Sequence, residues 1–264
     1  MAPFPSLMLE PIQELEFLAL QGFGGIEIRW TSFCALGYLE DGSMQELAKT
    51  LKKAHLRVVS WSCPSDPEVM NRASYAADTL RVFTASAGTV FICVDPPDGY
   101  DWRIDRLQEV SAVGEQWSVT LCPRLPQGGS REHLHDLLQN LDALHSHYLG
   151  LCFDPARLIG CGVVDLGTAW IGMARHVRLC RASRGPVEGQ EINYPAVKEL
   201  LFQAPGCDGI VVEEVERSAA FGAFLDHLFR LWPQGDEGRQ EPKVSLFPSS
   251  YVRSPRPRRK KKLF

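Results

Sequence analysis

The sequence predicts an α/β fold, a (β/α)8 barrel whose first strand is weak or missing, and three observations lead to this prediction. Short apolar segments rich in β-branched residues alternate with helical segments over most of the chain. That alternation is typical of a parallel sheet covered by helices. Seven strand–helix units follow one another at similar spacing, which favours a closed barrel over an open sheet. The length of 264 residues suits one barrel.

The first half of the chain supplies four of the predicted strands. A helix is expected over residues 11–21, and Gly22 ends it before a strand at 25–30. Ser43 and Glu46 form a capping box for the next helix, which ends near residue 55. The other elements of this half are predicted at residues 57–63 (strand), 67–85 (helix), 89–95 (strand), 104–117 (helix) and 118–122 (strand).

The second half repeats the pattern with three more strands. Ser130 is expected to cap a helix that runs to about residue 147. The other elements are predicted at residues 149–154, 176–180 and 208–214 (strands) and at 164–174, 195–203 and 218–232 (helices). An eighth strand is required before the first helix, and only residues 1–8 are available for it. Pro5 makes this segment a poor strand, so the first strand is weak or missing.

The composition changes after Trp232, and this change divides the chain into two regions. Residues 1–233 are predicted to form the barrel domain, and residues 234–264 a disordered, basic C-terminal tail. The tail is first polar and then rich in arginine and lysine. Three roles remain open for it: a nuclear-import signal, a contact with an anionic surface, and a solubilising end, which we favour.

Bulk composition argues against several classes of protein. The formal net charge of −4 gives no reason to expect nucleic-acid binding by the barrel. No apolar run reaches the roughly 18 residues that a transmembrane helix needs, and the N-terminus lacks the features of a signal peptide. The eight cysteines form no CxxC pair, so we expect reduced, buried thiols rather than a zinc site. A cytoplasmic protein without membrane contact is expected, and the basic tail leaves a nuclear location open.

Barrel enzymes carry their functional residues at the carboxyl ends of the strands. At these predicted ends, the charged residues include Glu27, Asp95, Arg124, Asp154, Arg178, Arg184 and Glu214. Ile210, Val212 and Glu214 share one face of a strand, so Glu214 is expected to point into the barrel and to need a partner. Structural alternatives remain open for all of them: ion pairs for the glutamates and arginines, a helix cap for Asp154, and the start of a loop for Asp95.

Six segments form an ordered set that carries a resemblance to a known family. They are residues 22–28, 51–59, 150–154, 175–179, 190–195 and 208–214. The set resembles the xylose isomerase-like TIM barrel family, which contains sugar-phosphate isomerases and epimerases, dehydratases and endonuclease IV. The resemblance extends from about residue 10 to residue 232, and it is more specific for the fold than for one activity. Glu27 matches a glutamate that is often found on the family's second strand.

The resemblance implies a site for one divalent metal at the ends of the fifth to eighth strands. The family holds the metal with Glu, Asp, His and Glu, a ligand set that suits Mn²⁺, Mg²⁺ or Co²⁺. Asp154 matches the aspartate and Glu214 the final glutamate, whereas Arg124 and Arg178 stand at the other two ligand positions. A further histidine position of the family is taken by Arg157.

The arginines at ligand positions indicate a degenerate metal site. A guanidinium is always protonated and cannot coordinate a metal, so the cofactor is a divalent ion only if the site still functions, and otherwise none. The two arginines are instead expected to neutralise Asp154 and Glu214 through forked hydrogen bonds. Alternatively, Arg178, Arg181 and Arg184 bind a phosphate or carboxylate together; Arg184 matches a substrate-binding arginine of the family.

Two functions therefore remain open. The first is a sugar or sugar-phosphate isomerase or epimerase in which Glu214 is the acid/base and Asp154 its partner, with a dehydratase-type lyase as a less favoured variant. The second is a non-catalytic barrel that binds a small anion or a protein partner. Four residues are expected to contact a small anionic or polyhydroxylated ligand: Glu27, Arg124, Arg178 and Arg184. Metal binding would separate the two functions, whereas the sequence leaves the substrate and the oligomeric state open.

Overall fold

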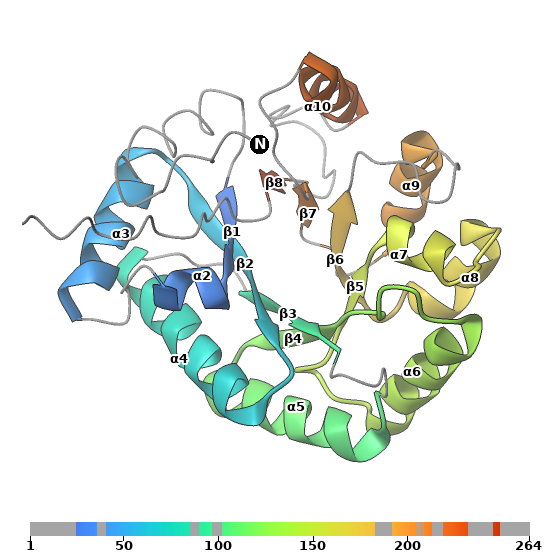
Figure 1. Ribbon diagram of the computed structural model, residues 1–264, viewed down its shortest axis with the longest axis horizontal. Helices are drawn as coiled ribbons and strands as arrows, with labels where there is room; N and C mark the ends of the chain where they lie inside the picture. The colour runs from blue at the N-terminus through green and yellow to red at the C-terminus, as the bar shows by residue number, and fades with distance from the viewer. Residues whose placement is uncertain are drawn as a thin grey trace, which may run out of the picture.

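The computed structural model describes residues 25–35, 41–84, 90–96, 102–182, 192–204, 207, 209–212, 219–231 and 245–248. Within these residues, parallel strands form two four-stranded sheets with helices on the outside (Figure 1). The first sheet contains, in order, β1 (Gly25–Arg29), β2 (Arg57–Pro64), β3 (Phe91–Asp95) and β4 (Thr120–Pro123). The second contains, in order, β5 (Leu151–Phe153), β6 (Val177–Ala182), β7 (Gly209–Val212) and β8 (Ser245–Pro248).

The two sheets meet at both of their edges. At one edge, Leu121 of β4 pairs with Leu149, and the amide of Gly150 donates to the Leu121 carbonyl at 2.9 Å. At the other edge, β1 lies next to β8. The ring of parallel strands with outer helices is the predicted (β/α)8 architecture, the TIM barrel.

The helices cover the outside of the ring (Figure 1). They are α2 (Trp30–Ala35), α3 (Asp41–Lys53), α4 (Pro67–Thr84), α5 (Ile104–Trp117), α6 (Arg131–Leu144), α7 (Pro155–Gly160), α8 (Leu166–Met173), α9 (Tyr194–Leu201) and α10 (Ala219–Leu231). Ser130 caps α6 as predicted, in a reciprocal capping box with His133. The predicted cap at Ser43 is wrong, because α3 already begins at Asp41. None of these described helices is long and apolar enough to cross a membrane.

The eighth strand comes from an unexpected part of the chain. The sequence analysis expected it at residues 1–8, which lie outside the described residues. Instead, β8 pairs in parallel with β7 from Gly209↔Ser245 to Val212↔Pro248 and lies beside β1. The expectation of disorder over 234–264 is therefore wrong for the four residues of β8. Pairing with β8 satisfies backbone groups of β7 that would otherwise form an open edge.

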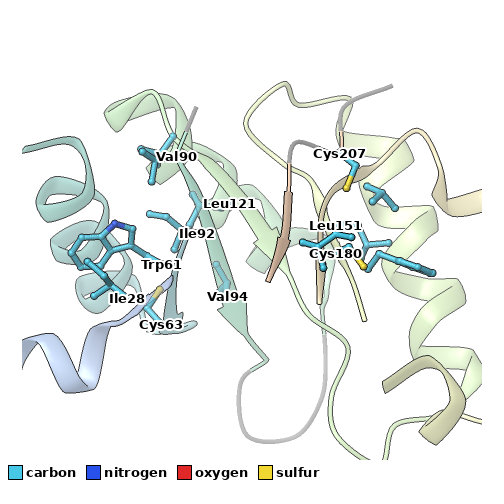
Figure 2. Close-up of a cluster of buried hydrophobic side chains, with 14 of the residues drawn as sticks. Ile28, Trp61, Cys63, Val90, Ile92, Val94, Leu121, Leu151, Cys180 and Cys207 are labelled. Atoms are coloured by element: carbon cyan, nitrogen blue, oxygen red, sulfur yellow. The ribbon is translucent and has the colours of Figure 1, made fainter. Parts of the chain in front are cut away.

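Buried apolar side chains form two layers, because successive side chains of a strand point to opposite faces. The inner layer fills the barrel with Val59, Phe91, Cys93, Cys122, Cys152, Leu179 and Val211. The outer layer lies between strands and helices, and Figure 2 shows part of it, from Ile28 and Trp61 across to Leu151 and Cys180. All eight cysteines are free thiols, and all except the partly exposed Cys34 are buried, as the sequence predicted.

Candidate functional site

Polar side chains gather at the carboxyl ends of β1 to β5, around a pocket of about 440 Å³. Strand register explains why they meet. Ser62, Cys93 and Cys122 are cross-strand partners, so their side chains share the inner face of the barrel. Asp95 and Arg124 lie two residues beyond the two cysteines and therefore project to the same side, at the mouth. Other lining residues are Arg29, Thr31, Gln127 and Arg157.

Arg124 is the centre of this mouth. Its side chain is almost fully buried, and its two terminal nitrogens are bound to two different carboxylates. Nη1 lies 3.1 Å from Asp95 Oδ1, and Nη2 lies 3.1 Å from Asp154 Oδ2. The backbone is also fixed, because the indole of Trp102 donates to the Arg124 carbonyl at 2.7 Å. The fork of the guanidinium thus joins the ends of β3 and β5.

Asp154 is engaged by a second arginine as well. Its Oδ1 accepts a hydrogen bond from the backbone amide of Arg157 at 3.1 Å, which caps α7. The guanidinium of Arg157 also approaches Asp154 Oδ2 at 3.5 Å and Asp95 Oδ1 at 3.7 Å. Both oxygens of Asp154 are therefore in use. Two arginines and two aspartates form one cluster, and it contains the ion pair between Arg124 and Asp154 that the sequence analysis expected.

Glu27 lies deeper in the barrel, in a second buried cluster. Its side chain is 0% exposed, Oε2 accepts from the Ser60 hydroxyl at 2.8 Å, and Oε1 pairs with Arg181 Nη2. Arg181 is 1% exposed and comes from β6, so the pair joins the two four-stranded sheets through the interior. This geometry is the ion-pair alternative for Glu27 rather than an open ligand contact.

Of the remaining predicted residues, the structure describes only Arg178, which lies away from the mouth. Arg178 stands near the amino end of β6 and donates to the carbonyls of Arg175 and Val177 at 2.9 and 3.0 Å. Its expected position beside the mouth is therefore wrong, and Arg181 is the arginine of β6 that faces the interior. Arg184 and Glu214 lie outside the described residues.

The prediction that Glu214 points inward assumed that Ile210 also faces the interior. The described part of β7 shows the opposite. Ile210 belongs to the outer layer, whereas Val211 belongs to the inner one. Cys180 pairs with Ile210, and Arg181 pairs with Val211, which agrees with this assignment. The inward face of β7 is thus the one that the sequence analysis assigned to the outside.

Two residues of the mouth were undervalued from the sequence. Asp95 was read as a loop-initiating residue, although it lies in phase with the inner Cys93 at the end of its strand. Arg157 was noted only at a replaced histidine position, although helix periodicity brings its side chain back to the Asp154 that caps its helix. The signal for Asp95 was present in the alternation along its strand.

The described residues of the mouth offer neither a nucleophile nor a fitting set of metal ligands. Cys63 lines the pocket, but burial, with a further contribution from Asp95, raises the pKa of its thiol strongly and keeps it neutral. Among the described residues, no group of three or more His, Cys, Asp and Glu side chains is placed to hold a metal ion. Asp154, the matched ligand, already accepts from two arginines, which would repel a divalent cation. The described residues therefore do not fit the divalent metal that the resemblance implies.

Solved structures with similar folds come from the xylose isomerase-like barrels. A xylose isomerase-like TIM barrel protein from Mycobacterium smegmatis, in complex with magnesium, matches with a TM-score of 0.62 at 13% identity, over 85% of this chain and 88% of that one. The probable 3-DHS dehydratase AsbF of Bacillus anthracis, involved in petrobactin synthesis, matches with a TM-score of 0.60 at 13% identity, over 82% and 92%. A sugar phosphate isomerase/epimerase from Parabacteroides distasonis matches with a TM-score of 0.57 at 12% identity, over 84% and 92%.

These comparisons establish the fold and leave the activity open. No protein-family model and no curated protein matches the sequence. The chain thus has the fold of xylose isomerase-like TIM barrels, as the sequence analysis inferred, and at such low identity the likeness shows the fold alone.

Proposed function

We propose that this protein is a non-catalytic barrel that binds a small, polyhydroxylated anion at its carboxyl-end mouth without a divalent metal at Asp154. One observation carries the proposal: Arg124 and Arg157 occupy both oxygens of the carboxylate that would otherwise hold the metal. A carboxylate in that state is an internal counter-ion. It orients the two guanidiniums and does not offer lone pairs to a cation.

The lining of the pocket supports the chemical class of the ligand. Among the described residues that line it, three are arginines and one is an aspartate, so arginine side chains are the main charged groups of this part of the wall. Hydroxyl and amide groups of Thr31, Ser62 and Gln127 stand among these charges and can bond to the hydroxyls of a ligand. A pocket of about 440 Å³ has the size typical of small-molecule sites. These features favour a small molecule with several hydroxyls and one phosphate or carboxylate.

The rival function is proton transfer on a sugar or sugar phosphate by Glu214 and Asp154. The fold of the neighbouring isomerases, epimerases and dehydratase is what supports it. Its mechanism needs a carboxylate within reach of a substrate proton. Both oxygens of Asp154 are already bound inside the protein, and Glu214 lies outside the described residues. The geometry therefore supports the binding function better than this one.

The test is a pair of thermal-shift titrations. Mn²⁺, Mg²⁺ and Co²⁺ are added in one series, and sugar phosphates and sugar acids in the other, at constant ionic strength. A ligand that binds only the folded state raises the melting temperature. We expect the anions to raise it and the metals to leave it unchanged. A metal-induced rise that is lost in Asp154→Asn would overturn the proposal in favour of a metal-dependent isomerase.

Three variants locate the binding. Arg29→Gln removes a cationic lining residue, and we expect at least about tenfold weaker anion binding. Asp154→Asn removes a negative charge beside the pocket, so anion affinity should stay or rise. Arg103→Gln is the matched control, because Arg103 is an exposed surface residue paired with Asp105. Equal affinity in Arg29→Gln and the control would place the anion elsewhere.

A further inference from the structure

A second pocket, of about 700 Å³, lies at the opposite, amino-terminal end of the barrel. It is formed by the end of α6 and by the segments that lead into β5 and β6. Its polar lining comes mainly from Asp142, His145, Arg175, His176 and Arg178. None of the residues that line the mouth takes part in it.

Two kinds of contact hold the Arg178 side chain in this pocket: packing of its aliphatic stem and hydrogen bonds to backbone carbonyls. A Cβ at Gly150 would come within 2.5 Å of Arg178 Cγ, so the absence of a side chain at Gly150 makes the space for the stem. The guanidinium is then fixed by Nη1, which donates to the carbonyls of Arg175 and Val177. A guanidinium has five N–H groups, and only those of Nη1 are used in these bonds. The Nε and Nη2 groups are left for a ligand.

The carboxylate of Asp142, which lines the pocket, contacts residues other than Arg178. Asp142 Oδ2 pairs with Arg175, and Asp142 Oδ1 lies 2.7 Å from His176 Nε2. No carboxylate pairs with Arg178 among the described residues. The half-buried guanidinium therefore gives the pocket an uncompensated positive charge, in a cavity large enough for a small molecule.

We propose that this pocket is a second anion site, in which Arg178 binds an oxyanion, a phosphate or carboxylate group, through Nε and Nη2. Arg175 and His145 also line this pocket and add hydrogen-bonding groups to its wall. The fork geometry of a guanidinium matches two oxygens of such a group. The proposal does not depend on the function assigned to the mouth, because the two pockets lie at opposite ends of the barrel.

Inorganic phosphate is the probe, and the readout is an NMR titration of the full-length protein against sodium chloride of equal ionic strength. The backbone amide of Gly150 reports on this pocket, because the stem of Arg178 packs against it. We expect saturable shifts of Gly150, and at least about tenfold weaker binding in Arg178→Gln. Arg29→Gln, at the mouth, should leave the Gly150 titration unchanged.

Arg178→Lys keeps the positive charge and most of the aliphatic stem. It therefore tests the forked contact of the guanidinium even where Arg178→Gln does not fold. Severalfold weaker phosphate binding in this variant would support a forked contact. No phosphate-dependent shift of Gly150, or the same affinity in Arg178→Lys and in the wild type, would overturn the proposal. A titration lost in Arg29→Gln and kept in Arg178→Gln would also overturn it, because the phosphate would then bind at the mouth.

Discussion

The two ends of the barrel carry ion pairs of similar chemistry in different surroundings. At the carboxyl end, the side chains of Arg124 and Asp154 are each 5% exposed, and below them, in the interior, those of Glu27 and Arg181 are 0% and 1% exposed. At the amino end, those of Asp142 and Arg175 are 39% and 65% exposed. Ion pairs between arginine and a carboxylate are therefore shielded from solvent at one end and exposed to it at the other.

This difference decides what each cluster contributes. A buried charge depends on its partner, because removal of one leaves the other uncompensated in a medium that solvates it poorly. An exposed pair is solvated and screened, so it contributes little to stability. We infer that pairing fixes the geometry of the carboxyl end, whereas the groups at the amino end are freer to rearrange around a ligand.

The largest expected effect is on the buried pair. Glu27→Gln removes the negative charge that is paired with the buried Arg181 guanidinium, and we expect a loss of about 3–5 kcal/mol in the free energy of unfolding. Urea denaturation followed by circular dichroism measures it. Asp142→Asn is the matched control at the wet end, with an expected loss of at most about 1 kcal/mol.

A double variant sharpens this first test. Glu27→Leu combined with Arg181→Met replaces both charges with apolar groups, and such a replacement is often close to neutral. The double variant should therefore recover much of the stability that Glu27→Gln loses. Equal losses in Glu27→Gln and Asp142→Asn would break the proposed contrast between the two ends.

The sequence predicted the alternating strands and helices because local patterns encode them. The ion pair of Arg124 with Asp154 was expected from the family resemblance, which places both residues at ligand positions. The sequence analysis misplaced Arg178 for a physical reason. The pairing of β5 with β6 shifts between Leu151 and Cys152, whose partners are Val177 and Leu179. Arg178 falls in this irregularity, and β6 continues to Ala182, two residues past the predicted end of the strand, so Arg178 lies near the amino end of β6. A bulge depends on contacts between two strands, and no composition signal marks it.

The eighth strand escaped prediction for a related reason. β8 contains only four residues, Ser245–Pro248, and it follows a polar segment. A run this short carries no periodicity that could distinguish it from a loop. Its position is set by pairing with β7 and by packing beside β1, and a local sequence pattern encodes neither contact.

The thiols of the inner layer test whether the two ends are separate. A hydrogen bond with Cys152 and burial raise the pKa of Cys93, and burial raises that of Cys122. Thiolate is the reactive form, so we expect these inner thiols to resist alkylation at pH 8 in the folded protein. Cys34 is partly exposed and should react first. Mass spectrometry after limited alkylation identifies the labelled residues.

Alkylation in urea provides the control, since all eight thiols should then react. Labelling of Cys93 or Cys122 in the folded protein, at a rate close to that of Cys34, would mean that reagent reaches the interior. The mouth and the amino-end pocket would then communicate through the barrel, and binding at one could no longer be treated as independent of the other.

The smallest expected effect is a pH dependence at the amino end. Burial lowers the pKa of His176, and the bond to Asp142 only partly opposes it. The histidine of the unfolded chain therefore takes up a proton at a higher pH, near 6.5, than the folded one. In that window the unfolded state binds more protons, so stability falls as pH drops below about 6.5. For Asp142, burial opposes the bonds from His176 and Arg175, which prevail and lower its pKa, so its contribution is lost only below about 3.8.

The two windows do not overlap, so His176 can be tested alone between pH 5 and pH 7. His176→Gln keeps an amide nitrogen near Asp142 and cannot titrate. We expect its free energy of unfolding, measured by urea denaturation, to fall less than that of the wild type as the pH drops. His135→Gln, on α6, is the control and should keep the wild-type slope. An unchanged slope in His176→Gln would mean that water reaches the imidazole as freely when the chain is folded as when it is unfolded. The amino end would then be wetter than its half-buried histidine indicates.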